Sequence, residues 1–249
     1  MKSLFGIAFI LLVLAGALVA FAPATLVDSR LAHATNGQVR IAEAAGTLWR
    51  GQGLVVDRTG ALRVPVSWTV APWPLARGIV AIDLSASDAH GAVQGHVELN
   101  DQRIRIERFE LTLPASAITA AMANGAVHAG GALRLYSDAI THAPSGSSGS
   151  ARGEWRRARL VAFDGVVFDL GTVSASLAVR GTEFAGPLDA SGGEVLVNGQ
   201  IAFSASGARL DLELLPAANA TAAVRNALAK FGAVDARGEV RLRTSYPPR

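Results

Sequence analysis

The chain has 249 residues, of which 50% are hydrophobic and 17% are charged, a composition that excludes an intrinsically disordered protein. It contains no cysteine, which excludes disulfide bonds, thiolate metal sites and cysteine nucleophiles. The formal net charge is only +3 and is not gathered into a basic stripe, so the charge pattern of a nucleic-acid-binding protein is missing.

The first predicted element is an N-terminal membrane segment. Residues 4–22 carry no charge, and a helix of this length, at about 1.5 Å per residue, crosses a hydrocarbon core of about 30 Å. Lys2 precedes the segment, so we predict a cytoplasmic N-terminus at residues 1–3, a transmembrane signal anchor at residues 4–22 and export of the rest. The alternative is a signal peptide cleaved after Ala20-Phe21-Ala22. The length of the apolar run and the proline at position 23 argue against that cleavage.

The next predicted region is a β-rich unit at residues 39–140. Its short stretches alternate polar and apolar residues, as in Arg103-Ile104-Arg105-Ile106, which places one strand face on a core and the other in water. Short connections rich in glycine favour antiparallel meanders over parallel units. One short helix is expected near residues 115–124, because Pro114 precedes it and Gly125 follows it.

A second β-rich unit is predicted at residues 152–245. It follows a Gly/Ser-rich segment at residues 141–151, which we interpret as a flexible linker or loop. Its own short helix is expected near residues 219–230, where Val224, Leu228 and Phe231 recur at helical spacing.

The two units share sequence markers in the same order. Residues 125–135 resemble residues 232–242, residues 113–115 match residues 215–217, and Trp49-Arg50 matches Trp155-Arg156. The offsets lie between about 102 and 107 residues, as expected of an internal repeat. We therefore predict a mainly β fold: antiparallel sheet built from two tandem copies of one unit, each with a short helix, plus the transmembrane helix.

The sequence contains no recognisable catalytic constellation. There is no phosphate loop, no dinucleotide fingerprint and no strand-turn-helix context for a nucleophilic serine. Of the five histidines only His90 and His96 lie close together, and the glycines between them favour solvated loop positions over metal ligands. We therefore expect no enzyme, no cofactor and no metal site.

Arginines and tryptophans are the remaining candidates for function. The possible docking arginines are Arg103, Arg105, Arg156, Arg157 and Arg159. They are either solvated strand residues that prevent edge-to-edge aggregation or a docking surface for an acidic partner or lipid headgroups. Trp49, Trp68 and Trp73 lie close together in the sequence. They either fill the core of the first unit or form an exposed aromatic cluster beside the membrane.

Several segments together resemble the type II secretion system protein N family, the general secretion pathway N proteins. The most specific of them is Gly46-Thr47-Leu48-Trp49-Arg50-Gly51. The others are Val66-Ser67-Trp68, Pro72-Trp73-Pro74-Leu75 and Leu111-Thr112-Leu113-Pro114, together with the N-terminal anchor and the total length.

This resemblance implies a single-pass inner-membrane protein with a periplasmic domain. Its function would be that of a non-enzymatic component of the apparatus that exports folded proteins across the outer membrane. Its implied partners are other proteins of that apparatus, from the inner-membrane platform, the pseudopilus or the secretin.

A looser similarity, to the AsmA-like group, rests on the anchored, duplicated, antiparallel β chain. It implies a groove associated with lipid handling, with phospholipid as the alternative ligand. A long sheet with an apolar concave face either closes on itself or holds a ligand, and the sequence leaves both arrangements open.

Overall fold

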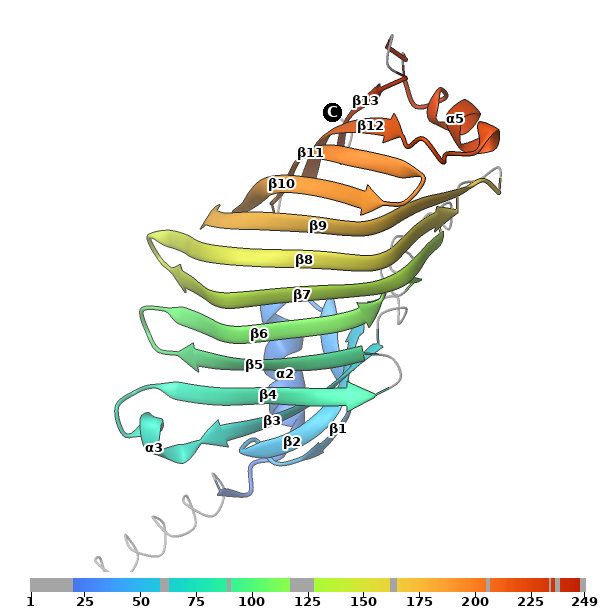
Figure 1. The fold of residues 1–249 in the computed structure, drawn as a ribbon. Helices are drawn as coiled ribbons and strands as arrows, with labels where there is room; N and C mark the ends of the chain where they lie inside the picture. Colours follow the sequence, from blue (N-terminus) through green and yellow to red (C-terminus); the bar gives the residue numbers. More distant parts are fainter. Residues whose placement is uncertain are drawn as a thin grey trace, which may run out of the picture.

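The computed structural model describes residues 20–58, 63–88, 91–116, 128–161, 165–204, 207–232, 234–235 and 238–246. In this part of the chain, thirteen strands form one sheet in which each strand pairs antiparallel with its neighbours in the sequence (Figure 1). The strands are β1 (Val39–Gly46), β2 (Arg50–Asp57), β3 (Arg63–Ala71), β4 (Val80–Asp88), β5 (Gly91–Leu99), β6 (Ile104–Pro114), β7 (His128–Ala143), β8 (Gly146–Val161), β9 (Val167–Gly181), β10 (Glu183–Gly192), β11 (Val195–Ser204), β12 (Gly207–Pro216) and β13 (Val240–Tyr246). The described helices are α2 (Thr25–Ala34), α3 (Pro72–Leu75) and α5 (Ala222–Leu228).

The sheet has one apolar and one polar face, and the strand register shows both as continuous rows. The apolar row crosses β6 to β13 through Leu113, Leu133, Trp155, Val173, Ala190, Val197, Leu214 and Val240. The polar row, one residue along each strand, runs through Thr112, Arg134, Glu154, Ser174, Asp189, Asn198, Glu213 and Arg241. Since side chains alternate along a strand, a slip of one residue would exchange the two rows, and this specifies the register strongly.

Two apolar clusters lie at the two ends of the sheet. At the N-terminal end, α2 lies against β1 (Figure 1), and its Val27 and Leu31 pack on a cluster that includes Ile41 and Trp68. At the C-terminal end, Val224 and Leu228 of α5 are buried in a cluster with Val195 and Val240. Each helix therefore stabilises one end of the sheet by covering its apolar face.

Several sequence predictions are confirmed here, and one is wrong. The sheet is antiparallel and mainly β as predicted, and α5 lies within the helix expected at residues 219–230. Of the helix expected near residues 115–124, only residues 115–116 are described, and both are helical; the rest lies outside the described residues.

The flexible linker predicted at residues 141–151 is instead a β-hairpin. Strands β7 and β8 pair through His142↔Ser147 and Ala143↔Gly146, so only residues 144–145 form a turn. Glycine at position 149 allows β7 and β8 to lie close together, because a Cβ on Gly149 would lie 2.4 Å from the Ala139 carbonyl oxygen. Composition alone was misleading, because backbone hydrogen bonds pair small residues as readily as large ones.

The predicted anchor falls mostly outside the described chain, which begins at residue 20. Within residues 20–246, leaving aside the gaps given above, no helix has the length and apolarity needed to cross a membrane.

The tandem duplication stays a prediction. The Leu-Pro steps of the two proposed units do occupy similar places: Pro114 is the last residue of β6 and Pro216 is the last residue of β12. In both cases the chain returns as the next strand of the sheet, β7 or β13.

Candidate docking surfaces

The segment from Gly46 to Gly51 forms the tight turn between β1 and β2. Gly46 has a φ of +94°, and a Cβ at this position would lie 2.5 Å from the Arg50 carbonyl oxygen. The Thr47 N–H donates to that oxygen at 2.9 Å, while the Arg50 N–H donates to Thr47 Oγ1 at 3.2 Å. Thr47 and Gly46 therefore act structurally, by closing the turn.

The same turn holds the buried indole of Trp68, which is 4% exposed. Its Nε1 donates to the Leu48 carbonyl oxygen at 3.1 Å. The ring lies against Gly51, where a Cβ would meet Trp68 Cζ2 at 2.3 Å. Trp49 is half-buried and packs against the same cluster. Trp68 thus belongs to the core of this end of the sheet.

The turn also receives the chain at the end of the predicted anchor. The Leu48 N–H donates to the Ala22 carbonyl oxygen at 2.8 Å, and the Ala24 N–H donates to the Gly46 carbonyl oxygen at 3.2 Å. Pro23 forms an isolated β-bridge with Thr47. The segment from Ala22 to Ala24 is therefore held firmly against the sheet.

The other predicted motif residues lie on different elements. Trp73 and Pro74 are in α3, where Trp73 is 86% exposed and Pro74 is half-buried. Pro114 ends β6 opposite Ala132. The structure brings the Gly46–Gly51 turn and Trp68 together, but Pro114 pairs with a different part of the sheet.

Most of the proposed docking arginines already have acidic partners within the chain. Arg105 pairs with Glu107, Arg156 donates to both carboxylate oxygens of Glu154 at 2.9 Å, and Arg159 lies 3.7 Å from Asp169.

Two arginines differ from these. Arg103 lies just before β6, and Arg157 sits in an irregularity of β8 with a φ of +50°. Both are exposed, and neither forms an ion pair with a described residue. Arg103 and Arg157 are therefore the arginines best placed to meet an external anion.

The polar face carries a ladder of compensating charges. The Arg134 guanidinium, 2.8 Å from Glu110, lowers the pKa of that carboxyl group. Arg156 lowers the pKa of Glu154 in the same way, and Arg241, followed by Arg243, lowers that of Asp211. Every shift favours the charged form, so these groups are suited to ion pairing rather than to proton transfer near neutral pH.

The histidine prediction needs one correction. His96 lies in strand β5 rather than in a loop, and its Nδ1 is 2.7 Å from Asp83 Oδ1 across the β4–β5 pair. Glycine did not prevent strand formation, because both neighbouring strands supply ladder partners. Among the described residues, no group of three or more histidine, aspartate and glutamate side chains could hold a metal ion; His90 lies outside them.

The two edges of the sheet differ sharply. At β1, the Val39 N–H donates to Thr35 Oγ1 at 3.2 Å and the Ile41 N–H donates to Asp28 Oδ1 at 2.8 Å. The Asp28 carboxylate also pairs with Arg40 at 2.7 Å, which lowers the pKa of Asp28. Helix α2 and its side chains therefore occupy the outer side of β1, an arrangement that blocks strand addition.

In the described part of the chain, the outer side of β13 is bridged only near its first residue. Val240 forms a bridge with Val234, and the Asp235 N–H donates to the Glu239 carbonyl oxygen at 3.0 Å. Since backbone groups alternate along a strand, the N–H and C=O groups of Arg243 and Ser245 also point outward. No strand in the described part of the chain pairs with them.

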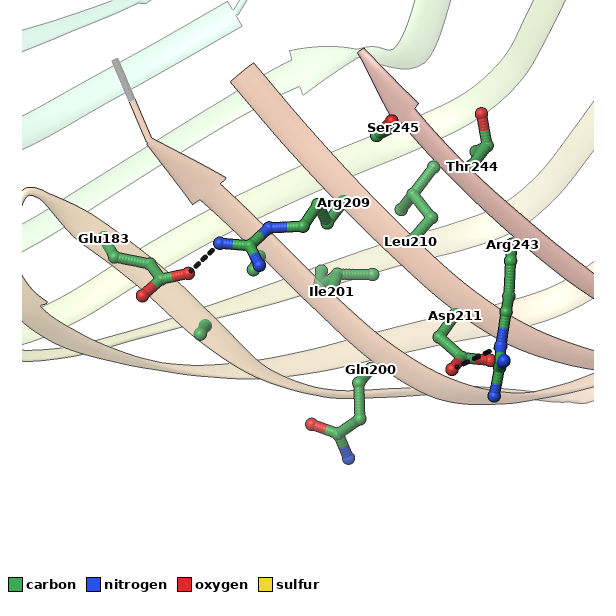
Figure 2. Close-up of a pocket in the computed structure, with 11 residues that line it drawn as sticks. Glu183, Gln200, Ile201, Arg209, Leu210, Asp211, Arg243, Thr244 and Ser245 are labelled. Atoms are coloured by element: carbon green, nitrogen blue, oxygen red, sulfur yellow. Dashed lines mark hydrogen bonds and ion pairs between the residues drawn. The ribbon is translucent and has the colours of Figure 1, made fainter. Parts of the chain in front are cut away.

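A hollow of about 460 Å³ lies on the polar face next to this edge (Figure 2). It spans β10 to β13, with the small side chains of Ala185 and Ala202 in its lining. Figure 2 shows two ion pairs there: Arg209 with Glu183 at 3.4 Å and Arg243 with Asp211 at 3.0 Å. The open edge thus adjoins a polar surface that offers both signs of charge.

The residues that distinguish the two edges have no clear signal in the sequence. Asp28 and Thr35 read as ordinary helix and turn residues, and nothing in their local pattern indicates a contact with a strand that follows them. The alternation of Val240-Arg241-Leu242-Arg243 indicates a strand, but an alternating pattern does not show whether that strand lies at the edge of a sheet.

The family model for type II secretion system (T2SS), protein N, matches residues 37–243. A search of curated proteins and a search of solved structures gave no match. The matched region runs from the start of β1 into β13 and includes the Gly46–Gly51 turn, Trp68, Trp73 and Pro114. The chain belongs to the type II secretion system protein N family.

Proposed function

We propose that the chain is a non-enzymatic, single-pass inner-membrane component of the type II secretion apparatus. In this proposal residues 4–22 anchor it with the N-terminus in the cytoplasm, and the β sheet lies in the periplasm. Family membership supports a role in the apparatus, and the uncharged N-terminal segment supports the anchor.

The sheet binds another apparatus protein through the outer edge of β13. The observation that carries this proposal is the difference between the two edges. The edge at β1 is blocked by Asp28 and Thr35, whereas the outward backbone groups of Arg243 and Ser245 pair with no strand in the described part of the chain. An extended segment of a partner can add to such an edge through main-chain hydrogen bonds. The partner belongs to the inner-membrane platform, the pseudopilus or the secretin.

Site-directed crosslinking tests this docking site. Because the native chain has no cysteine, Ser245→Cys gives one reactive position at the edge, and Asp101→Cys gives an exposed control in the turn before β6. In membranes that contain the whole apparatus, a thiol-directed photocrosslinker at position 245 should capture a secretion-system subunit. Equal capture from both positions, or capture of no apparatus subunit from position 245, would contradict the proposed edge.

Deletion of the gene tests the role in secretion. We expect exported proteins to accumulate in the periplasm, and a plasmid copy should restore their release. Normal release in the deletion strain would contradict the role in the apparatus.

A second candidate function is binding of phospholipid acyl chains on the apolar face. The supporting observation is that apolar side chains in the middle of the sheet, such as Leu135, Leu177 and Leu188, remain half-exposed. Lipid extraction from the crosslinked sample distinguishes the two functions. Stoichiometric phospholipid, together with an outer-membrane permeability defect in a strain with normal secretion, would favour lipid handling.

A further inference from the structure

Trp73 is the most exposed large apolar side chain in the described part of the chain, at 86%. The other tryptophans are buried or half-buried: Trp68 is in the core, and Trp49 and Trp155 pack against the two apolar clusters. A tryptophan side chain buries about 150–250 Å² when it is packed, and most of this area remains exposed to solvent in Trp73.

A rigid turn holds Trp73 in this position. Helix α3 begins with Pro72 and also contains Pro74, and both rings restrict the backbone. The N–H groups of Ala76, Arg77 and Gly78 donate to the carbonyl oxygens of residues 73, 74 and 75 at 2.9–3.3 Å. The exposure of Trp73 is therefore a property of an ordered element.

Backbone hydrogen bonds connect this turn to the end of the predicted anchor. Ala22 is bonded to Leu48 at 2.8 Å, and the Val70 N–H donates to the Trp49 carbonyl oxygen at 2.7 Å, three residues before Trp73. Figure 1 shows α3 and the start of the described chain at the same end of the sheet, opposite β13. Phe21, at 79% exposed, and Leu26, at 46%, lie on the chain that enters here.

Two arginines lie in the segments that meet at this end. Residues 20–27, 44–51 and 70–79 contain Arg50 and Arg77 but no aspartate or glutamate; the carboxylates that flank these segments are Asp28, which pairs with Arg40, and the exposed Glu43. Both arginines are exposed, and neither forms an ion pair with a described residue. Arg77 lies four residues after Trp73, in the hydrogen-bonded turn that follows α3.

We propose that this end of the sheet rests on the periplasmic leaflet of the inner membrane. Trp73, Phe21 and Leu26 enter the interfacial region, where tryptophan is favoured because its ring has an apolar body and a polar N–H. Arg50 and Arg77 contact lipid phosphates. The proposal rests on the anchor of the proposed function, but not on the identity of any partner. It would hold the open edge of β13 away from the membrane.

Spin labels on the full chain test this contact. The chain would be reconstituted in vesicles of phosphatidylethanolamine and phosphatidylglycerol. The absence of native cysteine allows single labels at Trp73→Cys, at Phe21→Cys, and at Ser191→Cys as an exposed control near the end of β10. The labels at positions 73 and 21 should be more accessible to oxygen than to a water-soluble nickel complex, and the label at position 191 should show the reverse.

The outcomes separate this contact from the anchor. A lipid-exposed label at position 21 with a water-exposed label at position 73 would overturn the contact and leave the anchor standing. Water-exposed labels at both positions would overturn the anchor as well.

Native fluorescence provides a test in which Trp73 itself is kept. Brominated lipids should quench the wild-type protein, and Trp73→Phe should remove that quenched component, because the other three tryptophans lie in or against the protein core. Equal quenching of the wild-type protein and the variant would also contradict the contact.

Discussion

Gly51 and Trp68 illustrate how single residues act in this protein. Both belong to segments that resemble the family, and the sequence left open whether the tryptophans serve the core or an interface. The structure places the Trp68 indole directly on Gly51, with a hydrogen bond to the Leu48 carbonyl oxygen. Trp73, only five positions further on, is exposed. Residue type alone could not separate these roles, because both side chains are indoles in the same short stretch.

Trp68→Ala should lower the free energy of unfolding by about 3–5 kcal/mol, the usual cost of truncating a buried tryptophan. Trp49→Ala should cost less, because that side chain is only half-buried. Gly51→Ala should also destabilise, since the new Cβ would clash with the ring. Denaturant unfolding of the purified full chain in detergent measures these effects. A Trp68→Ala protein as stable as the wild type would contradict a core role.

Asp28 should make stability depend on pH. Arg40, and then the Ile41 N–H, lower its pKa in the folded state, against the opposing effect of burial. Because the pKa of Asp28 is lower in the folded protein than in the unfolded chain, its charge stabilises the fold at pH values above the unfolded-state pKa. This stabilisation is lost as the pH falls through the folded-state pKa. Asp28→Ala should cost about 1–3 kcal/mol at neutral pH, because the Ile41 N–H loses its acceptor.

The control for the charge of Asp28 is Asp28→Asn, which keeps an acceptor. The difference in unfolding free energy between the wild type and Asp28→Asn should shrink below about pH 4. There the aspartate of the unfolded chain takes up its proton, while that of the folded protein is still charged. A constant difference from neutral to acidic pH would show that the charge contributes nothing.

At the scale of elements, the hairpin of β7 and β8 is the clearest departure from sequence-based expectation. The Gly/Ser-rich composition of residues 141–151 is typical of a linker, yet both strands continue through most of the segment. The helix predicted near residues 219–230 is present as α5, and Val224 and Leu228 of its apolar spacing are buried, whereas Phe231 lies beyond α5 and is exposed. The spacing of apolar residues predicted structure correctly where it indicated which side chains are buried. The content of glycine and serine was misleading, because it indicated only that the side chains are small.

A short Gly-Ser insertion separates the two interpretations of residues 141–151. Between residues 144 and 145, in the exposed turn, it should be tolerated with little change in stability. Between Gly149 and Ser150 it should destabilise strongly, because it shifts the pairing of β8 with both β7 and β9. Thermal unfolding of the two variants provides the comparison, and equal tolerance at both sites would favour a linker.

Ser245→Pro tests the open edge of β13. Proline removes the outward N–H, which has no strand partner in the described chain, so folding should be nearly unaffected. Binding of an added strand should weaken, because one ladder hydrogen bond is lost. Ser245→Ala keeps the N–H and serves as the control. The measurements are unfolding midpoint and recovery of apparatus subunits from membranes, and undiminished recovery with Ser245→Pro would argue against strand addition.

At the scale of the whole molecule, the described part of the chain forms one long meander with an apolar and a polar face. The continuous rows from β6 to β13 mean that each strand from β6 to β12 is stabilised by both neighbours, whereas β13 is stabilised by β12 alone. The proposed membrane contact lies at one end of this sheet and the open edge at the other (Figure 1). The sheet would thus connect the inner membrane to a partner located further into the periplasm.

Membrane topology gives the prediction at this scale. Alkaline phosphatase fused after residue 249 should be active, and a reporter that requires the cytoplasm should be inactive at the same site. The protein should also stay with the membrane after carbonate extraction. Mass spectrometry that finds a mature chain beginning near Pro23 would replace the anchor by a cleaved signal peptide, while the periplasmic location would stand.

The sequence by itself determined the mainly β class, the antiparallel order, the helix before β13 and the family. Those conclusions depend on local information: alternation along a strand, turn residues between strands, helical spacing and one short motif. Only the tertiary structure decided which edge is blocked, which arginines are paired and which tryptophan is exposed. Each of these depends on residues far apart in the chain, as when Asp28 accepts from the Ile41 N–H or Arg134 pairs with Glu110. No local pattern encodes such partners, because the register of the whole sheet brings them together.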